Sequence, residues 1–292
     1  MSPNITKTKK YDYFNMLSVI IPTCDRNELL SNCLNCFSLK FQNIHKADYE
    51  VIVTDDSKQH QAKQLIEEKY NWVKWIAGPQ KGPAANRNNG AKNANGDWLV
   101  FIDDDCLPDS NILRAYETAI TNNKNTLVFE GCIKSDRARQ NLAEESPVNE
   151  SGGYLWSCNF MIDKITFLNK LGGFDEKFPY AAMEDVDLDY RLSKHTISKI
   201  FVKNAFVIHP WRVQKNMWTI TIKRFKSTLY FLNKHPEKKK EINSKYYLIA
   251  FYNSFVKNTL KNVVKYRFRG LPGKIAYDML QLYFCFYTLI YK

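Results

Sequence analysis

Residues 97–105 read Asp-Trp-Leu-Val-Phe-Ile-Asp-Asp-Asp, a short apolar run that ends in three consecutive carboxylates. The run predicts a buried strand, and residues 17–23 (Leu-Ser-Val-Ile-Ile-Pro-Thr) and 49–54 (Tyr-Glu-Val-Ile-Val-Thr) predict two more. Asp55 and Asp56 follow the last of these, where a turn or helix cap is the ordinary interpretation. Three adjacent carboxylates repel one another unless a cation lies among them, and a hard divalent ion is the usual partner. The triplet therefore predicts a metal site.

Helical spacing of apolar residues fills the segments between the strands. Residues 27–39, 61–70, 83–95 and 163–171 are predicted as helices, and residues 72–76 as a short strand. This alternation predicts an α/β fold with a mixed, mainly parallel sheet flanked by helices. Ligands of such sheets bind at the carboxyl ends of the strands, so we expect the acidic strand ends to line one crevice. The chain has no GxGxxG or P-loop motif, so a glycine-rich turn is not expected to hold phosphates.

Composition and charge exclude several classes of protein. The chain has 292 residues, of which 45% are hydrophobic and 14% aromatic, which excludes a disordered or low-complexity protein. Residues 1–195 contain 23 basic and 27 acidic side chains, whereas residues 196–292 contain 19 basic and 3 acidic ones. We therefore expect different partners for the body and the basic region. The odd number of cysteines, seven, and the polar segment at residues 1–15 predict a cytoplasmic protein without a disulfide framework or signal peptide.

Two stretches in the second half of the body are also informative. Residues 151–160 (Ser-Gly-Gly-Tyr-Leu-Trp-Ser-Cys-Asn-Phe) are small and aromatic, and residues 172–176 read Gly-Gly-Phe-Asp-Glu. Residues 183–189 (Met-Glu-Asp-Val-Asp-Leu-Asp) then open a predicted helix. Carboxylates in a first helical turn are ordinarily caps or partners of the helix dipole, and we keep that interpretation for Asp187 and Asp189.

Together with the strand ends and residues 86–90 (Asn-Arg-Asn-Asn-Gly), these stretches resemble the family 2 glycosyltransferases, which have the GT-A fold. The resemblance covers roughly residues 16–235. It implies a Rossmann-like GT-A catalytic domain at residues 16–216, with a nucleotide-binding half at 16–110 and an acceptor half at 111–216.

The resemblance also implies roles for single residues. Asp185 matches the catalytic base. The nucleotide sugar would be contacted by Pro22, Thr23, Asp25, Arg26, Asp56, Arg87, Asp103 and Asp104. The acceptor side would include Trp156, Asn159 and Glu184. Asp105 and His209 would bind Mn²⁺ or Mg²⁺, although a lone histidine after an apolar strand is more often structural.

These roles predict an inverting, metal-dependent transfer of one sugar from a nucleotide sugar, with a UDP-sugar favoured, to a glycan or lipid-linked acceptor in bacterial surface polysaccharide synthesis. Processive members of the family carry Gln-x-x-Arg-Trp, whereas residues 214–218 read Gln-Lys-Asn-Met-Trp, so we expect one transfer per event. The alternative is a catalytically inactive GT-A-like module that binds a nucleotide or glycan. Such a module would lack the metal acid, the base or the nucleotide acid, and this chain has all three.

Residues 217–292 are predicted as a basic, aromatic helical region, with a break at residues 270–273 before a final aromatic helix. Residues 275–291 are interrupted by Asp278 and Gln281, so they do not predict a membrane span. Basic and aromatic faces suit contact with anionic lipid, and packing on the catalytic domain is the alternative. We expect a peripheral position on the inner face of the cell membrane. The region lacks a nucleic-acid-binding motif, so no nucleic acid partner is expected.

Overall fold

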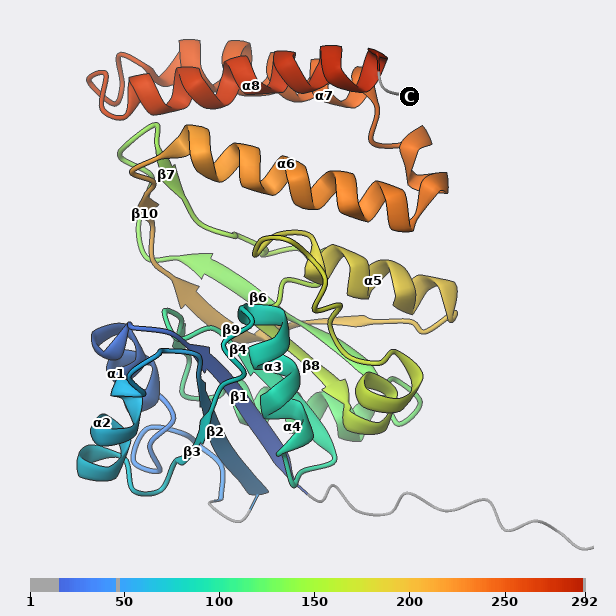
Figure 1. The fold of residues 1–292 in the computed structure, drawn as a ribbon. Helices are drawn as coiled ribbons and strands as arrows, with labels where there is room; N and C mark the ends of the chain where they lie inside the picture. Colours follow the sequence, from blue (N-terminus) through green and yellow to red (C-terminus); the bar gives the residue numbers. More distant parts are fainter. Residues whose placement is uncertain (1–15, 46–47, 291–292) are drawn as a thin grey trace, which may run out of the picture.

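A single large sheet forms the centre of the molecule (Figure 1), which is a computed structural model that describes residues 16–45 and 48–290. The predicted polar segment at residues 1–15 lies outside the described residues. The sheet has eight strands in the order β3-β2-β1-β4-β8-β6-β9-β5. Its strands are β1 (Leu17–Thr23), β2 (Tyr49–Asp55), β3 (Lys74–Ala77), β4 (Trp98–Ile102), β5 (Leu107–Pro108), β6 (Val128–Ser135), β8 (Asn159–Asp163) and β9 (Ile200–His209).

The sheet is mixed, with a parallel nucleotide-side half. Strand β1 runs parallel to both β2 and β4, and β2 runs parallel to β3. Strand β8 lies antiparallel between β4 and β6, while β6 and β9 are parallel with a register shift between Gly131 and Cys132. Two further strands, β7 (Glu144–Glu145) and β10 (Arg212–Val213), form a separate antiparallel pair. The predicted fold class is confirmed by this arrangement.

Helices cover both faces of the sheet because successive strand residues point to opposite sides. One hydrophobic core joins the strands to α1 (Asn27–Asn35), α2 (Gln61–Lys69) and α4 (Ile112–Asn122). A second core, on the other face, joins them to α3 (Pro83–Lys92), η2 (Thr166–Lys170) and α5 (Glu184–Lys194). Helix α3 approaches β1 closely because it carries Gly90, where a side chain would collide with Ile20.

Several predicted helices differ from the structure in their ends or type. The helix predicted at residues 27–39 ends at Asn35, after which the amides of Cys36 and Phe37 turn back to the carbonyls of Cys33 and Leu34. In the helix predicted at residues 163–171, Asp163 still belongs to β8, its carboxylate accepts a hydrogen bond from the Thr166 amide at 2.7 Å, and residues 166–170 form the π-helix η2. The helix predicted at residues 83–95 ends at Lys92, where the amide of Asn93 turns back to the carbonyls of the preceding residues.

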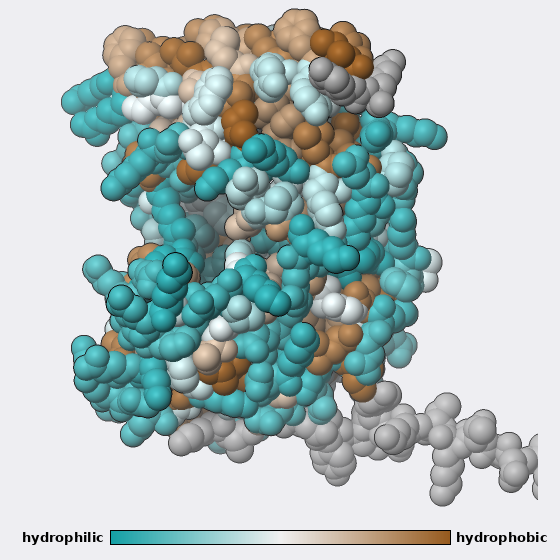
Figure 2. All heavy atoms as spheres, viewed as in Figure 1, coloured by the Kyte–Doolittle hydropathy of each residue, from teal (hydrophilic) through white to brown (hydrophobic). Residues whose placement is uncertain are grey.

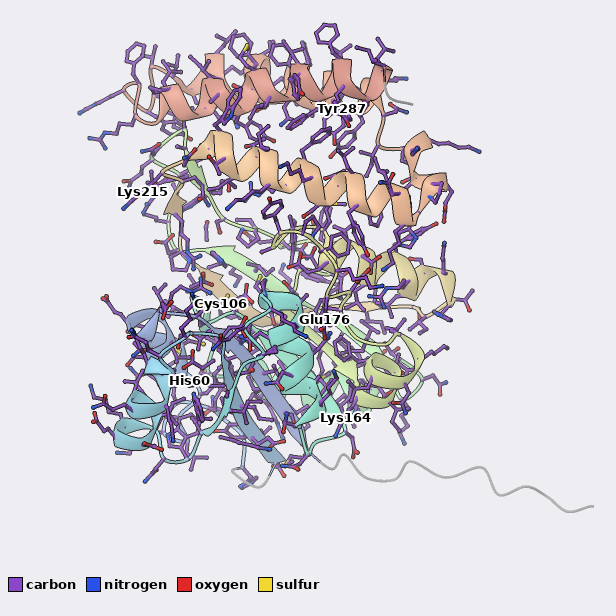
Figure 3. All side chains as sticks on the ribbon, viewed as in Figure 1. His60, Cys106, Lys164, Glu176, Lys215 and Tyr287 are labelled. Carbon is purple, nitrogen blue, oxygen red and sulfur yellow. The ribbon has the colours of Figure 1, made fainter. Side chains whose placement is uncertain are left out.

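A helical layer follows the sheet domain. It consists of α6 (Met217–Lys234), η3 (Pro236–Lys240), α7 (Ser244–Phe251), the π-helix η4 (Tyr252–Leu260) and α8 (Leu271–Ile290). Helix α6 lies between α5 and the outer helices α7 and α8 (Figure 1). Phe225 of α6 and Phe284 of α8 stack with ring centroids 3.7 Å apart, and Tyr287 points from α8 toward α6 (Figure 3). No helix in the described part of the chain combines the length and apolar character needed to cross a bilayer.

Candidate active site

The carboxyl ends of three parallel strands meet at one edge of the sheet, as the sequence predicts. Strand β1 lies between β2 and β4, so the acids that follow these two strands flank the end of β1. The hydroxyl of Thr23, at the end of β1, donates a hydrogen bond to Asp104 Oδ2 at 2.7 Å. This bond ties the start of the acidic turn after β4 to the neighbouring strand.

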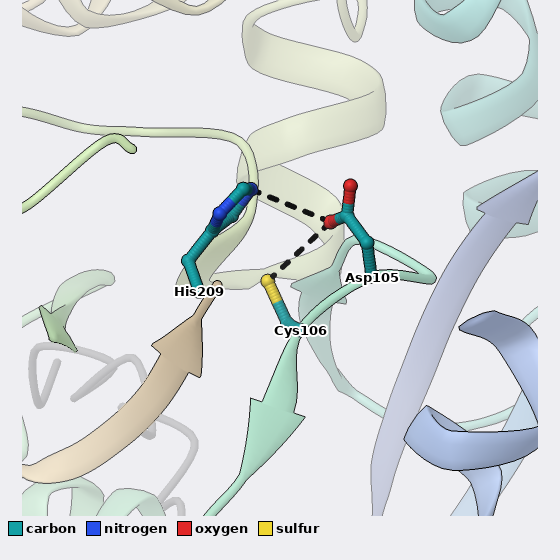
Figure 4. Close-up of side chains that lie close together, drawn as sticks. All are labelled: Asp105, Cys106 and His209. Atoms are coloured by element: carbon teal, nitrogen blue, oxygen red, sulfur yellow. Dashed lines mark hydrogen bonds and ion pairs between the residues drawn. The ribbon is translucent and has the colours of Figure 1, made fainter. Parts of the chain in front are cut away.

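Asp105 faces a histidine from the other half of the sheet (Figure 4). His209 Nε2, at the end of β9, lies 3.4 Å from Asp105 Oδ1, and Cys106 Sγ lies 3.9 Å from the same oxygen. Burial raises the pKa of the Cys106 thiol well above its usual range. Carboxylate and imidazole are donors that Mn²⁺ accepts, whereas a soft sulfur donor favours softer metals such as zinc. Asp105 and His209 therefore fit Mn²⁺ or Mg²⁺ better than Cys106 does.

Two arginines lie beside the acidic turn. Arg26 Nη2 lies 2.7 Å from Asp104 Oδ1, and its Nη1 lies 3.4 Å from Asp105 Oδ2. Arg212, in β10, contacts the Asp105 carboxylate as well. Burial raises the pKa of Asp104 to about 6, although the Arg26 charge and the Thr23 hydrogen bond act in the opposite direction. Two guanidinium groups at this edge suit recognition of a diphosphate.

Arg87 connects the strand-end acids to the start of α5. This α3 residue is 5% exposed; its Nη2 donates to Asp103 Oδ1 at 2.7 Å, and its Nη1 lies 3.6 Å from Glu184 Oε1. Burial alone would raise the pKa of Asp103, but the charge and hydrogen bond of Arg87 outweigh burial and lower it. Asp103 is therefore ionised at neutral pH.

Glu184 and Asp185 form a buried carboxylate pair at the start of α5. The amide of Val186 donates to Asp185 Oδ1 at 2.8 Å, and burial nevertheless raises the pKa of Asp185. Burial, followed by the charge of Asp185, raises the pKa of Glu184 to about 7. Met183, just before the helix, has a φ of 74°, a conformation that is costly for a residue with a side chain. Strain and raised pKa values together are typical of a catalytic site.

Several buried polar atoms around this pair have no hydrogen-bond partner in the described part of the chain. They are Nε and Nη1 of Arg87, Oε2 of Glu184 and Nε1 of Trp156. Trp156 stacks on the exposed Tyr154 with ring centroids 6.1 Å apart. Buried polar groups are normally paired, so these atoms mark positions where the polar groups of a ligand would bind.

The structure gives the remaining predicted nucleotide-side residues different surroundings. Asp56 accepts hydrogen bonds from the amides of Gln80 (2.6 Å) and Gly82 (2.9 Å), and so holds the loop before α3. Pro22 is buried within β1, and Asp25 lies exposed in the turn that follows. Their contacts with a nucleotide remain predictions.

Asn159, predicted on the acceptor side, is used inside the protein. Its amide hydrogens go to the carbonyls of Cys132 (2.8 Å) and Ala205 (3.0 Å), and its carbonyl accepts from the Tyr116 hydroxyl at 2.8 Å. With both amide hydrogens used, Asn159 stabilises the sheet in this structure.

Sequence reasoning missed two contributors. Arg212 reaches Asp105 from β10, and its position three residues after His209 was the available signal. His235, at the end of α6, lies with its Nε2 2.8 Å from Asp187 Oδ1, beneath the start of α5. Asp187 is structural, but as a buried partner of Arg191, Lys234 and His235, and within the described residues it makes no capping hydrogen bond to the start of the helix.

The mixed sheet, with acids after two parallel strands and a carboxylate pair at the start of a helix, is the arrangement of the GT-A fold. Residues 18–169 match the family described as Glycosyl transferase family 2. The chain belongs to this family.

Known proteins resemble the chain at low identity. It is 25% identical over 264 residues to validoxylamine A glucosyltransferase of Streptomyces hygroscopicus subsp. limoneus, covering 76% of this chain and 57% of that protein. It is 23% identical over 288 residues to GalNAc(5)-diNAcBac-PP-undecaprenol beta-1,3-glucosyltransferase of Campylobacter jejuni, covering 89% of each. The chain thus spans little more than half the length of the first relative.

A solved structure supports the fold. The mannosyltransferase PcManGT from Pyrobaculum calidifontis, in complex with GDP-Man and Mn²⁺, aligns with a TM-score of 0.61 and 17% identity. The alignment covers 93% of this chain and 88% of the mannosyltransferase.

Proposed function

We propose that this chain is an inverting glycosyltransferase that moves one sugar from a nucleotide sugar to a hydroxyl of a glycan or lipid-linked acceptor. The observation that carries the proposal is the position of Arg87 between two acidic groups. Its guanidinium pairs with Asp103 at the nucleotide-side strand end and lies 3.6 Å from Glu184, the neighbour of Asp185. A donor lying over Arg87 would therefore reach the acidic turn with its diphosphate side and Asp185 with its sugar side.

In the proposed reaction Asp185 is the base. The acceptor oxygen forms a bond to C1 of the sugar while the bond from C1 to the diphosphate oxygen breaks, and the electron pair leaves with the diphosphate. Asp185 takes the proton of the acceptor hydroxyl, which is too weak an acid to ionise beforehand. General base catalysis of this kind contributes ~10²- to 10⁴-fold. Arg26 and Arg212 lie where they would offset the charge that grows on the diphosphate.

Asp105 and His209 would hold Mn²⁺ or Mg²⁺. The ion, when bound, supplies Lewis-acid stabilisation of the leaving diphosphate. The donor set supports this assignment, since one carboxylate oxygen and one imidazole nitrogen converge at 3.4 Å in a buried position. The structural neighbour from P. calidifontis is a complex with Mn²⁺.

The finer identity of the substrates is also proposed. A UDP-sugar is favoured because Asp56 holds the family position that contacts the base of such donors. Met217 stands where processive members have arginine, which supports transfer of one sugar per event. A lipid-linked acceptor agrees with the name of the C. jejuni relative, which contains undecaprenol. We place the reaction in bacterial surface polysaccharide synthesis, at the cytoplasmic face of the membrane.

A screen of UDP- and GDP-sugars for Mn²⁺-dependent binding and turnover tests the proposal. For the best donor, Asp185→Asn should lower transfer by ~10²- to 10⁴-fold with donor affinity unchanged, because only the proton acceptor is lost. Asp189→Asn is the matched control, since Asp189 lies on the same helix but pairs with Lys199 at 2.7 Å. Nearly full activity of Asp185→Asn would refute the base assignment. Donor binding without any turnover by the wild-type chain would favour the inactive binding module.

A further inference from the structure

The outermost helix of the chain, α8, carries a row of apolar side chains on its solvent-facing side, although Leu280 and Phe284 are buried on its inner side. Ile275, Met279, Tyr283, Phe286 and Ile290 recur at spacings of four, four, three and four residues, so they share one face of α8. All five are exposed, from 40% for Ile275 to 71% for Ile290. This apolar row of α8 therefore points away from the protein.

Three polar residues of α8 are buried on its inner side, beside Leu280 and Phe284. Asp278 is fully buried and accepts a hydrogen bond from Thr259 Oγ1 at 2.7 Å, and Lys274 pairs with the same carboxylate. Gln281 is 6% exposed. This buried polar network fixes α8 against η4. It therefore determines which side of α8 faces the protein and which side, the one with the apolar row, faces solvent.

The outer face extends over the neighbouring helices. Figure 2 shows apolar side chains gathered along the end of the molecule formed by the C-terminal helices. Its exposed apolar members in α7, η4 and the turn after η4 are Tyr246, Leu248, Ile249, Tyr252, Leu260, Val264 and Phe268. We call these residues and the five of α8 the outer face. Contiguous exposed apolar surfaces of this kind mark interaction sites.

A strained turn borders the outer face. Arg267 and Phe268 have φ values of 51° and 60°, and two consecutive left-handed residues with side chains are costly. Phe268 is nevertheless 62% exposed. The turn is attached to the catalytic domain, because the amide of Leu142 donates to the carbonyl of Arg269 at 3.0 Å. The fold thus retains strain in order to present an arginine and a phenylalanine to solvent.

The exposed charges of the segment that carries the outer face, residues 245–290, have one sign. Asp278 is the single acidic residue between positions 245 and 290, and it is buried. The exposed cations of the same segment are Lys245, Lys257, Lys261, Lys265, Arg267 and Arg269. Four cations, namely Arg139, Lys265, Arg267 and Arg269, line a cavity of about 270 Å³ beside the strained turn, and no acidic residue does.

We infer that the outer face docks on an anionic lipid bilayer, with the apolar side chains in the headgroup boundary and the cations on lipid phosphates. Charge distinguishes the two partners that could cover the outer face, which are a second copy of this chain and a lipid surface. A second copy of this chain would bring like charges together, whereas anionic lipids complement them. The inference adds a membrane-binding surface to the proposed location of the enzyme. It rests on the proposed function only for which side of the membrane the enzyme occupies.

Flotation of the full-length chain with vesicles tests this inference. We expect binding to phosphatidylcholine vesicles that contain about one third phosphatidylglycerol, weakened by salt, and little binding to phosphatidylcholine alone. Lys261→Glu/Lys265→Glu/Arg269→Glu should weaken partitioning by more than about tenfold, since each cation contributes about fivefold. The matched control, Lys63→Glu/Lys69→Glu/Lys124→Glu, makes the same change in net charge on exposed residues outside the helical layer and should bind as the wild type does.

A second variant tests the apolar contribution. Phe286→Ser/Ile290→Ser alters exposed side chains, so it should fold, and it should lose about tenfold or more in vesicle binding.

Equal binding of the wild type to neutral and anionic vesicles would overturn the inference. The inference would also be overturned if the wild type formed a dimer that did not bind vesicles and the Phe286→Ser/Ile290→Ser variant were a monomer. That result would assign the outer face to a second copy of this chain. Transfer to a water-soluble acceptor should be unchanged in all variants, so failure of that assay with the wild type would contradict the proposed function and not this inference.

Discussion

Glu184 and Asp185 show how adjacent carboxylates can be given different properties. Asp185 receives a hydrogen bond from the Val186 amide, whereas Glu184 Oε2 has no hydrogen-bond partner within the described residues. Burial raises the pKa of both groups, and that of Glu184 reaches about 7. A base with a raised pKa holds a proton more strongly, which favours its transfer from a hydroxyl.

Glu184→Gln should reduce the stability that the ligand-free protein loses as the pH rises. The pKa of Glu184 is about 7 in the folded chain, against ~4.3 when unfolded. The folded state therefore binds the proton more tightly, and wild-type stability falls as pH rises through this window. Glutamine has no such proton to lose. Thermal unfolding at about pH 5 and about pH 8 should show the difference in Tm, variant minus wild type, increasing with pH.

The control for this prediction is Glu67→Gln, a change of the same kind at an exposed position of α2. Its Tm difference from the wild type should stay constant between the two pH values. A difference for Glu184→Gln that does not vary with pH would show that the folded state does not raise the pKa of this carboxyl.

At the residue scale the sequence predicts local features well. The resemblance to the family puts Asp105 and His209 together as metal ligands, and the two side chains lie 3.4 Å apart. Arg212 was not foreseen, because its contact with Asp105 depends on the pairing of β10 with β7, which no local pattern encodes. Asn159 looked like an acceptor contact, but its bonds to Cys132 and Ala205 follow from the sheet order.

At the scale of elements, Asp187 joins three segments. This fully buried carboxylate lies 2.8 Å from Arg191 Nε, Lys234 Nζ and His235 Nε2. Arg191 continues the connection, since its Nη2 donates to the carbonyl of Gly173 at 2.8 Å. Asp187 thereby fixes α5 to α6 and to the Gly-Gly turn, and so positions the helix start that carries Asp185.

Asp187→Ala should destabilise the protein by about 3 to 5 kcal/mol, because it leaves buried cations without their carboxylate. Chemical denaturation of the variant and the wild type measures this cost. Asp189→Ala on the same helix removes a half-exposed partner of Lys199 and should cost about 1 kcal/mol or less. Equal costs for the two variants would show that the contacts of Asp187 add nothing to the stability of the fold.

Element identity was more predictable than element geometry. The strands at residues 17–23 and 49–54 follow from continuous apolar runs and lie within a residue of their observed ends. The segment at residues 163–171 has helical periodicity, and its residues 166–170 form a π-helix that follows the Asp163 cap. Periodicity alone does not distinguish these two kinds of helix.

At the scale of the whole molecule, the site and the outer face are separated. Helix α6 lies between α5, which carries Asp185, and the outer helices (Figure 1). A helix with its side chains is about 10 Å thick, so at least that distance separates the outer face from the catalytic crevice. If the acceptor is lipid-linked and the outer face docks on the bilayer, as proposed, the acceptor has to cross this layer to present its hydroxyl to Asp185.

The enzyme should therefore prefer lipid-linked acceptors with several sugars. In anionic vesicles, the rate of transfer to a lipid carrying several sugars should exceed the rate for the same lipid carrying one sugar by at least about tenfold. The reason is that a short acceptor does not reach the crevice and so is not held in position for the reaction. Initial rates at equal surface density measure the ratio. Water-soluble versions of the two acceptors are the control, and for them the ratio should shrink. Equal rates in vesicles would show that α6 does not act as a spacer.

The exposed apolar row of α8 also changes how the enzyme would meet its acceptor. A chain held at a bilayer by its outer face searches in two dimensions, with its crevice at a fixed height above the lipid. The relevant concentration is then the number of acceptors per membrane area, and tethering raises the effective concentration without any new contact at the crevice. Turnover would respond to the crowding of carrier lipids in the leaflet, and dilution of the surrounding solution would leave it unchanged.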